Sequence, residues 1–561
     1  HDPRHRAQRR PLGAPDVPAF VKLIAAPPDA AVDVTHDEVP GEVIKVNLLP
    51  NFEQPVDPSG PYVDQAFGNK PFVLDQQIYD TDRPYPPNPV ELTFMGRSRG
   101  MDIYQLTSFC GQYNPVTDEL QLYDRVHIDV TFRGNSQAFE PEFGRGPFES
   151  HRDVFTGALL NKNGIRTGGV IPDLGQYVNL GEEFMIMTHP SFRAAADALA
   201  DWKNQKGIVT HVYECGTGSA ITGRIFNSEI DAFIEDHYRT SKIKPRYILF
   251  LGDAEFIPTF LVPRAADPNA LVGSDHPYAV IPYEVLGITF DLFPTFAIGR
   301  IPVDTLDQAN TVVQKIINYE KNPPGSPLFE DDFYNRISIA AQFQCCRTDI
   351  DGIGYAQRTF VEMPESIRPA LLAAGYEVPR HYRETIDGGC ASCDPKIPAY
   401  TKDATPRRNF DGTLIPDEIG PGSGFSWTAN TADVVNAFND HSFIMFHRDH
   451  GAPTGWGDPP FNTSDIDSLT NGAYLPVVFS VNCSSGVFDN ETSGGAEGTT
   501  VDGVYFAEKL LRKADGGAVG VIGDSRISPS WPNSVLAKGF FDAIFPSVAP
   551  DFGDNTSKRR L

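Results

Sequence analysis

The sequence lacks any run of the about 20 apolar residues that a membrane-spanning helix requires, so we expect no membrane span. It also lacks an excess of basic residues, because 73 acidic residues stand against 47 basic ones and the formal net charge is −26. Phosphate binding needs a positively charged surface, and this balance argues against a nucleic-acid partner. An initiator methionine and the apolar core of a signal peptide are missing too. The chain opens on HDPRHRAQRR, which predicts a processed or truncated start.

Cysteine is scarce, with seven residues in 561. Four of them form two pairs that are close in sequence, Cys345 with Cys346 and Cys390 with Cys393. The other three, Cys110, Cys215 and Cys483, stand alone. The two pairs are consistent with two disulfides in a secreted protein, or with a four-cysteine zinc site. Neither interpretation uses Cys483, which therefore remains available for chemistry.

The composition, 40% hydrophobic and 21% charged, is that of a globular protein of two to four domains. Residues 1–165 are predicted to be rich in β-strands. Apolar residues alternate with polar ones over 126–132, and 90–94 forms a second strand-like run. The polar, glycine-rich stretch 143–169 is expected to be an exposed linker.

The pattern changes after this linker. Short apolar runs alternate with stretches of helical spacing, first over 166–330 and again over 331–548, and a polar tail follows at 549–561. Strands that are apolar on both sides and that alternate with helices predict an α/β fold with parallel sheets. The expected strands include 184–187, 208–212, 247–251, 296–301, 443–446, 477–481 and 518–522.

Two strand ends carry residues that could do chemistry. The strand 443–446 leads into His450 and Gly451, and the strand 477–481 leads into Cys483. Ligands of open parallel sheets collect beyond the carboxyl ends of the strands, where an imidazole could activate a thiol. The backbone N–H groups of Gly451 and Cys483 could hold an oxyanion. The alternatives are an inert core thiol and a loop histidine with a satisfied hydrogen bond, and His447 is interpreted as supporting structure.

The string HRDHGAPTGWGDPPFNTSDIDSLTNGAYLPVVFSVNCSSGVFD resembles the catalytic core of the gingipain family of cysteine peptidases, within the caspase-like clan. The spacing between His450 and Cys483 matches the family pattern without a gap. The segments YILFLGDAEFIP, SDHPYA, AIGRIPVDT and GGAVGVIGDSRIS agree as well, and GQYNPVTDELQLYDRVHIDVTF looks like the family's propeptide. The resemblance covers most of residues 90 to 545 in order.

The resemblance implies an all-β prodomain with its linker at 1–165, followed by a caspase-like α/β catalytic region of two subdomains, 166–330 and 331–548. It implies Cys483 as nucleophile and His450 as general acid/base, with Gly451 and Cys483 as oxyanion donors. Trp531 falls where the family places an aromatic wall of the specificity pocket, although a packing role is the alternative. No cofactor is needed for this chemistry.

The chain departs from the family at the third catalytic position. An acidic residue is expected just before the segment FAIGR, but Pro294 and Thr295 stand there, and Asp291 is the closest acid. Thr295 or Asp291 could orient the imidazole, or the enzyme works as a Cys-His dyad. Asp307 is a candidate for the first specificity pocket together with Asp304, which a helix N-cap explains equally well.

Two further expectations concern regulation and metal binding. A basic prodomain loop, carrying Arg97 or Arg99, is predicted to plug the catalytic site before activation. Asp489 and Glu491 lie in an acidic, glycine-rich loop after the nucleophile. Such a loop could hold a structural Ca²⁺, but it shows no EF-hand spacing, and an acidic loop without metal is the alternative.

These observations predict a secreted cysteine endopeptidase, at the cell surface or outside the cell, made as a zymogen. Its substrates are proteins or peptides, its own prodomain acts as inhibitor, and a cut in the linker between 145 and 166 activates it. A sortase-like transpeptidase would share the fold and the acyl-enzyme. A catalytically inactive binding or structural relative is the alternative of a different class.

Overall fold

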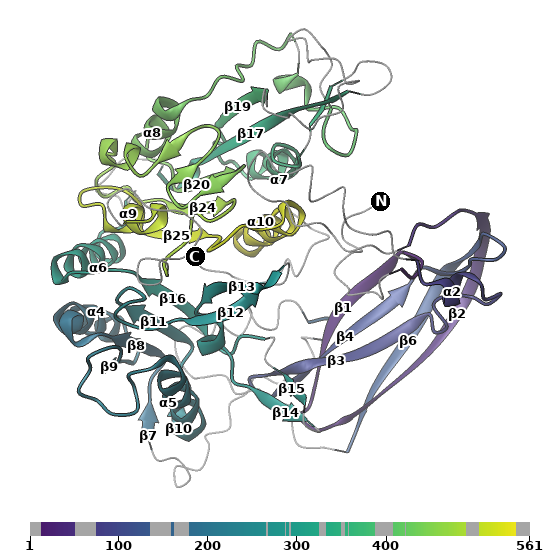
Figure 1. Ribbon diagram of the computed structural model, residues 1–561, viewed down its shortest axis with the longest axis horizontal. Coiled ribbons are helices and arrows are strands. Elements are labelled where there is room, and N and C mark those ends of the chain that lie inside the picture. The colour runs from purple at the N-terminus through teal and green to yellow at the C-terminus, as the bar shows by residue number, and fades with distance from the viewer. Residues whose placement is uncertain are drawn as a thin grey trace.

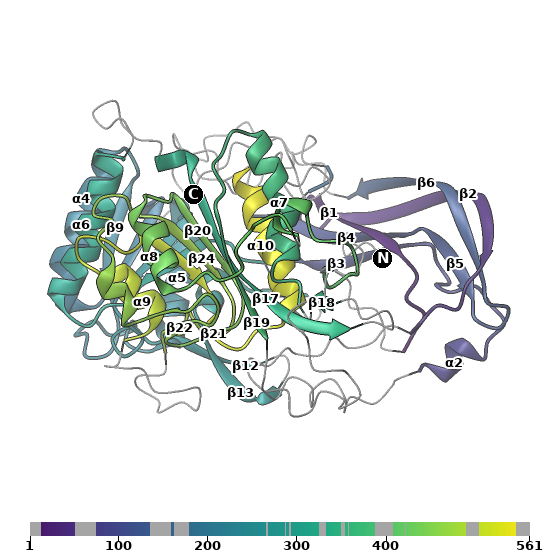
Figure 2. The same ribbon diagram turned by 90° about the horizontal axis from the view of Figure 1, so that it is seen from above.

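The computed structural model describes residues 13–50, 74–134, 159–161, 179–264, 267–285, 288–290, 293–324, 333–348, 354–356, 358–386, 408–420, 422–489 and 504–545. Figures 1 and 2 show a β-rich N-terminal region on one side and two α/β subdomains on the other. The sheets lie within the ranges expected for prodomain and subdomains, and the exact boundaries between these parts remain predictions.

The N-terminal region is built from antiparallel strands, as predicted. One sheet has the order β1-β4-β3 and another the order β2-β6-β5. The predicted strand at 126–132 lies within β6 and that at 90–94 within β3. The elements are β1 (Ala19–Ala26), β2 (Ala31–Lys45), the short helix α2 (Gln76–Tyr79), β3 (Val90–Ser98), β4 (Met101–Phe109), β5 (Gly111–Asn114) and β6 (Glu119–Arg133).

The first α/β subdomain contains a parallel sheet of the order β16-β11-β8-β9. Its central strands, β8 and β11, are buried on both faces. Ile186 of β8 packs with helices α4 and α6, whereas Met185 and Met187 pack with α5 on the other face. This two-sided burial explains why the strands are continuous apolar runs. The elements are β8 (Phe184–Thr188), α4 (Arg193–Gln205), β9 (Thr210–Glu214), α5 (Asn227–Thr240), β11 (Tyr247–Leu251), β16 (Ala297–Ile301) and α6 (Leu306–Lys321).

The second α/β subdomain repeats this three-layer arrangement. Its sheet has the order β18-β17-β20-β24-β25, and β19 also pairs with β17. All pairings are parallel except that of β18. Helices α7 and α10 cover one face, and α8 and α9 cover the other. The elements are β17 (Ile337–Thr348), β18 (Gly354–Ala356), α7 (Glu362–Ala373), β19 (Arg380–Ile386), α8 (Thr431–Asn439), β20 (Ile444–Arg448), β24 (Val477–Val481), α9 (Phe506–Arg512), β25 (Gly520–Gly523) and α10 (Ser530–Ile544).

Short strands complete the structure. They are β7 (Asn179–Gly181) with β10 (Ser241–Ile243), β12 (Phe260–Arg264) with β13 (Asp267–Ser274), β14 (Tyr283–Val285) with β15 (Ile288–Phe290), and the group β21 (Gly451–Ala452), β22 (Gly455–Trp456) and β23 (Phe461–Asn462). Among the described helices, none has the length and apolar composition required to cross a membrane.

Helix α9 joins the two subdomains through polar contacts. The Nζ of Lys315, on α6, donates to the carbonyl oxygens of Leu511 at 2.9 Å and Lys513 at 3.0 Å, at the carboxyl end of α9. A cation at this end of a helix is favoured by the helix dipole and satisfies carbonyl groups that have no partner within the helix. Burial lowers the pKa of Lys315 to about 7. The first subdomain therefore holds an element of the second in place.

Candidate active site

The predicted catalytic residues follow two neighbouring parallel strands. Strand β20 ends at Arg448 and β24 ends at Val481, and these two residues are paired in the register. His450 and Cys483 each come two positions later, so both lie at the carboxyl edge of the second sheet. This is the edge at which ligands of parallel sheets collect.

Gly451 shows how closely the two loops approach. A methyl group on its Cα would lie 2.5 Å from the carbonyl oxygen of Cys483 and would also collide with the side chain of Asn482. Only a glycine permits this contact, because any Cβ would push the loops apart. The structure thus brings the loop that carries His450 against the loop that carries Cys483.

Cys483 carries a thiol outside any disulfide, and the residue is 6% exposed. Its Sγ lies 3.7 Å from the carbonyl oxygen of Ser528, just before helix α10. Ser484 has a φ of 56°, and its N–H donates to the carbonyl of Arg526 at 3.1 Å. This left-handed residue directly after the cysteine is uncommon for a residue with a Cβ, and strained backbone of this kind clusters at functional sites.

His450 is held in place by residues from outside its own loop. Its Nε2 lies 3.1 Å from Oε1 of Gln344, on β17, and its ring meets the ring of Phe360 edge to face at 5.2 Å. A carbonyl oxygen can only accept, so with the Gln344 amide in this orientation the ring hydrogen is assigned to Nε2, and Nδ1 is left as an acceptor. Burial, and then the charges of Arg358 and Arg448, lower the pKa of His450 to about 4. The imidazole is therefore neutral near pH 7.

The other polar residues at this edge fix the loops. His447 is fully buried and stacks on Trp456 with ring centroids 4.2 Å apart, and Asn482 Nδ2 lies 2.7 Å from its Nδ1. Burial holds the pKa of His447 well below its usual range. The Arg448 guanidinium donates to the carbonyl of Val481 and to Ser530 at the start of α10. His447 is thus part of the packing, in agreement with the interpretation from the sequence.

Comparisons with known proteins identify the family of this chain. Residues 179–561 match peptidase family C25, and residues 10–147 match the C25 propeptide. The chain belongs to peptidase family C25. Among curated proteins of Porphyromonas gingivalis, gingipain R2 is 22% identical over 96% of this chain and 62% of its own length, and Lys-gingipain is 22% identical over 96% of this chain and 26% of its own. The chain thus spans less than two thirds of these relatives.

Similar solved structures were also found. The Arg-specific cysteine proteinase gingipain R is 19% identical, with 66% of this chain and 68% of that chain covered and a TM-score of 0.47. The complex of the pro- and mature domains of RgpB from Porphyromonas gingivalis is 20% identical over 64% of this chain and 67% of that chain, with a TM-score of 0.44.

The residues expected to orient the imidazole of this C25 chain lie elsewhere or outside the described part. Thr295 is buried just before β16, at the amino edge of the first sheet, and its N–H donates to the carbonyl of Ala279. Asp291 lies outside the described residues. The hydrogen-bond partner that the structure gives His450 is Gln344, which sequence reasoning missed. The only signal for it is that Gln342 and Gln344 interrupt the apolar run that begins at Ile339.

The residues expected in the specificity pocket differ in position. Trp531 lies in the first turn of α10, three positions after the Ser528 whose carbonyl faces Cys483. Its role in the pocket stays a prediction. Asp307 is exposed in the first turn of α6, in the first subdomain, where Thr305 rather than Asp304 forms the N-cap. Asp304 instead forms an ion pair with Arg512 at 2.6 Å.

The expected Ca²⁺ site is described only in part. Glu491 lies outside the described residues. Both carboxylate oxygens of Asp489 accept hydrogen bonds from the Arg526 guanidinium, at 2.8 and 2.7 Å. A metal at Asp489 would therefore compete with an arginine, and Ca²⁺ binding in this loop stays a prediction.

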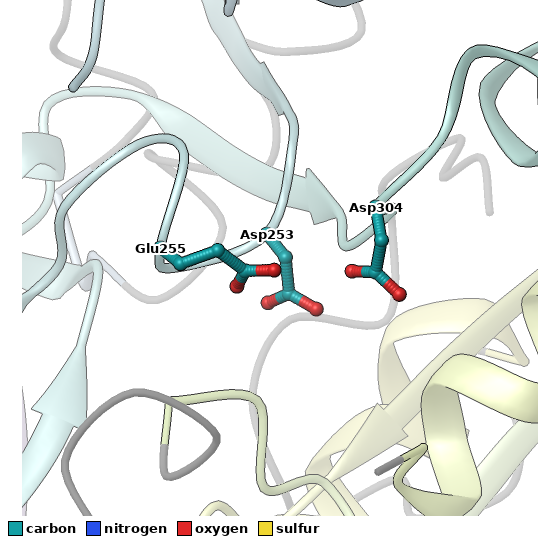
Figure 3. Close-up of side chains that lie close together, drawn as sticks. All are labelled: Asp253, Glu255 and Asp304. Carbon is teal, nitrogen blue, oxygen red and sulfur yellow. The ribbon is translucent and has the colours of Figure 1, made fainter. Parts of the chain in front are cut away.

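A second group of carboxylates lies at the carboxyl edge of the first sheet. Asp253, Glu255 and Asp304 point toward one another (Figure 3), with oxygen atoms within 4.8 Å of each other. The Arg512 guanidinium of α9 already binds Asp253 at 2.7 Å and Asp304 at 2.6 Å. Burial, and then the charge of Asp253, raise the pKa of Glu255 to about 7. This cluster joins the subdomains through Arg512.

Proposed function

We propose that this chain is a cysteine endopeptidase made as a zymogen, with Cys483 as nucleophile and His450 as general acid/base. The observation that carries the proposal is the close contact of the His450–Gly451 loop with the Cys483 loop at the carboxyl edge of the second sheet. A thiol and an imidazole that share such an edge are the minimal equipment for acyl transfer. Membership in family C25 and the preceding propeptide support the same function.

The geometry supports the following order of steps. Neutral His450 takes the proton of the Cys483 thiol at Nδ1, and the thiolate attacks the carbonyl carbon of the substrate's peptide bond. The N–H groups of Gly451 and Cys483 stabilise the oxyanion of the tetrahedral intermediate. His450 then gives its proton to the leaving amine, and water releases the acyl group from the sulfur. Gln344 keeps the imidazole in the tautomer that these steps need.

We further propose that the enzyme acts outside the cell or at the cell surface, on proteins or peptides. The acidic composition, with a net charge of −26, keeps such a protein soluble by self-repulsion. The β-rich N-terminal region would serve as its inhibitor until the linker that follows it is cut.

Labelling with a thiol-directed acyloxymethyl ketone tests the assignment of the nucleophile. We expect the linker-cut protein to become labelled and Cys483→Ala to lose both the label and the hydrolysis of peptide substrates. Cys215→Ala is the matched control, because Cys215 is also a free and buried thiol. A label that persists in Cys483→Ala would refute the proposal.

A further inference from the structure

The N-terminal region touches the first subdomain through the tip of one hairpin. Strand β3 ends at Ser98 and β4 begins at Met101, so Arg99 and Gly100 form the turn, with φ of 48° and 73°. Arg99 is 2% exposed, and its guanidinium donates to the carbonyl oxygen of Pro245 at 3.0 Å. A buried arginine at the tip of a hairpin is costly to desolvate, and this contact compensates that cost only while the two parts stay together.

Two further contacts lie beside Arg99. The hydroxyl of Ser98 donates to the carbonyl of Pro294 at 3.4 Å. The ring of Phe293 packs against an apolar cluster of the N-terminal region, made of Ala25, Met101, Ile103 and Leu159. Strand β15 also contacts β3, as Figure 1 shows at the base of the N-terminal region. The surface around Pro245, Phe293 and Pro294 therefore combines an apolar centre with two backbone acceptors.

Leu159 belongs to a piece of the linker that adds to the edge of β1. Leu160 donates its N–H to Leu23, and the Asn161 side chain exchanges two hydrogen bonds with the backbone of Ala25, at 3.0 and 2.7 Å. This isolated bridge and its hydrogen bonds hold residues 159–161 on the N-terminal region. It also completes the apolar cluster that receives Phe293.

This contact surface lies away from the catalytic residues. Pro245 and Pro294 come just before β11 and β16, at the amino edge of the first sheet, whereas His450 and Cys483 lie at the carboxyl edge of the second. Arg97 forms ion pairs with Asp102 and Asp29 inside the N-terminal region. The expectation that Arg97 or Arg99 plugs the catalytic site is therefore wrong, because the structure engages both guanidinium groups elsewhere.

We propose that the surface formed by Pro245, Phe293 and Pro294 is the binding site of the chain's own N-terminal region, with Arg99 as its anchor. This inference rests on the proposed zymogen and adds to it. It locates on the first subdomain the surface that binds the prodomain. A buried arginine that meets a backbone acceptor beside an aromatic ring has the character of an interface hot spot. Binding of the prodomain and blocking of the nucleophile then depend on different residues and can be separated.

The test uses the full chain with Cys483→Ala, which removes self-cleavage, and a recognition site for an unrelated protease inserted between residues 162 and 178. After the cut, size-exclusion chromatography at decreasing concentration measures the dissociation of the two pieces. We expect the parent pieces to stay together, and Arg99→Ala and Phe293→Ala each to raise the dissociation constant at least about tenfold. Arg125→Ala, at an exposed arginine of the same region, should leave it unchanged.

Each half of the interface has its own variant, so a folding defect in one does not decide the result. Thermal unfolding of the uncut chains identifies such a defect, and Arg99→Lys, which keeps the charge, should retain part of the affinity. Arg99→Ala and Phe293→Ala pieces that fold and stay associated as the parent pieces do would overturn the proposal. This outcome is independent of the proposed peptidase activity, because the assay needs no catalysis.

Discussion

The two parallel sheets place polar residues at the same kind of edge but use them differently. In the first sheet, Asp253 follows β11 and Asp304 follows β16, and Arg512 from the other subdomain binds both. In the second sheet, His450 and Cys483 follow adjacent strands, and their loops pack against each other through Gly451. One edge is neutralised by ion pairs, whereas the other presents the proposed base and nucleophile, His450 and Cys483.

A cysteine in each subdomain makes the comparison sharper. Cys215 comes directly after β9 and is fully buried, and burial raises the pKa of its thiol to about 12. Cys483 also follows a strand, but it lies against the loop that carries His450 and below the amino end of α10. A position after a parallel strand is therefore not enough for chemistry. The neighbouring strand must bring a base to the thiol.

Removing the imidazole of His450, the proposed base, should have the largest effect on catalytic rate. His450→Ala is expected to lower kcat by about 10²- to 10⁴-fold, since it removes general acid/base catalysis. Because the pKa of His450 is lowered to about 4, its neutral form is present above that pH, and kcat/KM of the parent enzyme should fall only near pH 4. The measurement is a pH profile of peptide hydrolysis by linker-cut protein. An acidic limb near pH 6.5 would contradict the buried, neutral imidazole.

Removing the charge that neutralises the first edge should destabilise the chain. Arg512→Ala leaves Asp253 buried without its partner and should lower the free energy of unfolding by about 3 kcal/mol, as loss of one member of a buried ion pair does. The raised pKa values of Asp253 and Glu255 mean that stability falls as pH rises through them, so the defect should grow from pH 5 to pH 8. Urea unfolding at both pH values measures it.

Lys509→Ala is the control for this variant. It lies on the same helix, and its ion-pair partner Asp467 is 66% exposed, so a loss below about 1 kcal/mol is expected. Equal losses in the two variants would show that Arg512 has no special role between the subdomains.

The residue that orients the base should have a smaller effect on rate and a clear effect on pH dependence. Gln344→Ala is expected to lower kcat about tenfold, by freeing the imidazole from its hydrogen bond. Gln344→Glu places a carboxylate at the same site and should move the acidic limb of kcat/KM to higher pH, because a negative charge favours the imidazolium. Gln342→Ala, two residues earlier on β17, serves as control. Identical pH profiles for the parent and Gln344→Glu would exclude the positioning role.

The smallest effect is expected at the inert cysteine. Cys215→Ser should leave kcat and the alkylation of native protein by iodoacetamide unchanged at pH 8, since a thiol with a pKa of about 12 is not ionised there. Mass spectrometry of the alkylated protein measures this. Rapid alkylation of Cys215 in the folded chain would show that its thiol is as reactive as expected for Cys483, and the two cysteines would then not differ.

The central strands of both sheets could be predicted because they are apolar on both sides, and this pattern depends only on local sequence. The sites after β20 and β24 followed from the rule that parallel strands share their carboxyl edge. Gln344 could not be found in this way, since it is a long-range contact of His450 from another strand. The start of α4 is not evident from side-chain chemistry either. Ser191 has the chemistry of an N-cap, but it lies in a 3-10 turn, Pro190–Phe192, and α4 begins at Arg193.

The position of Arg99 was missed for a related reason. Two arginines in a glycine-rich turn are typical of a surface loop, and the sequence does not indicate which carbonyl such a side chain will meet. Only the packing of β3 and β4 against the segment around Phe293 buries Arg99. Contacts between regions depend on tertiary structure that a single sequence does not encode in any local pattern.

Lys315 on α6 binds the carboxyl end of α9, and this contact limits how far the chain can be shortened. Excising residues 331–548 as a minimal peptidase would leave the carbonyls of Leu511 and Lys513 without their donor and Arg512 without Asp253 and Asp304. Helix α9 has only seven residues, too few to persist without outside support. The first subdomain thus supports the second, which carries Cys483, and we expect that a stable fragment must retain both.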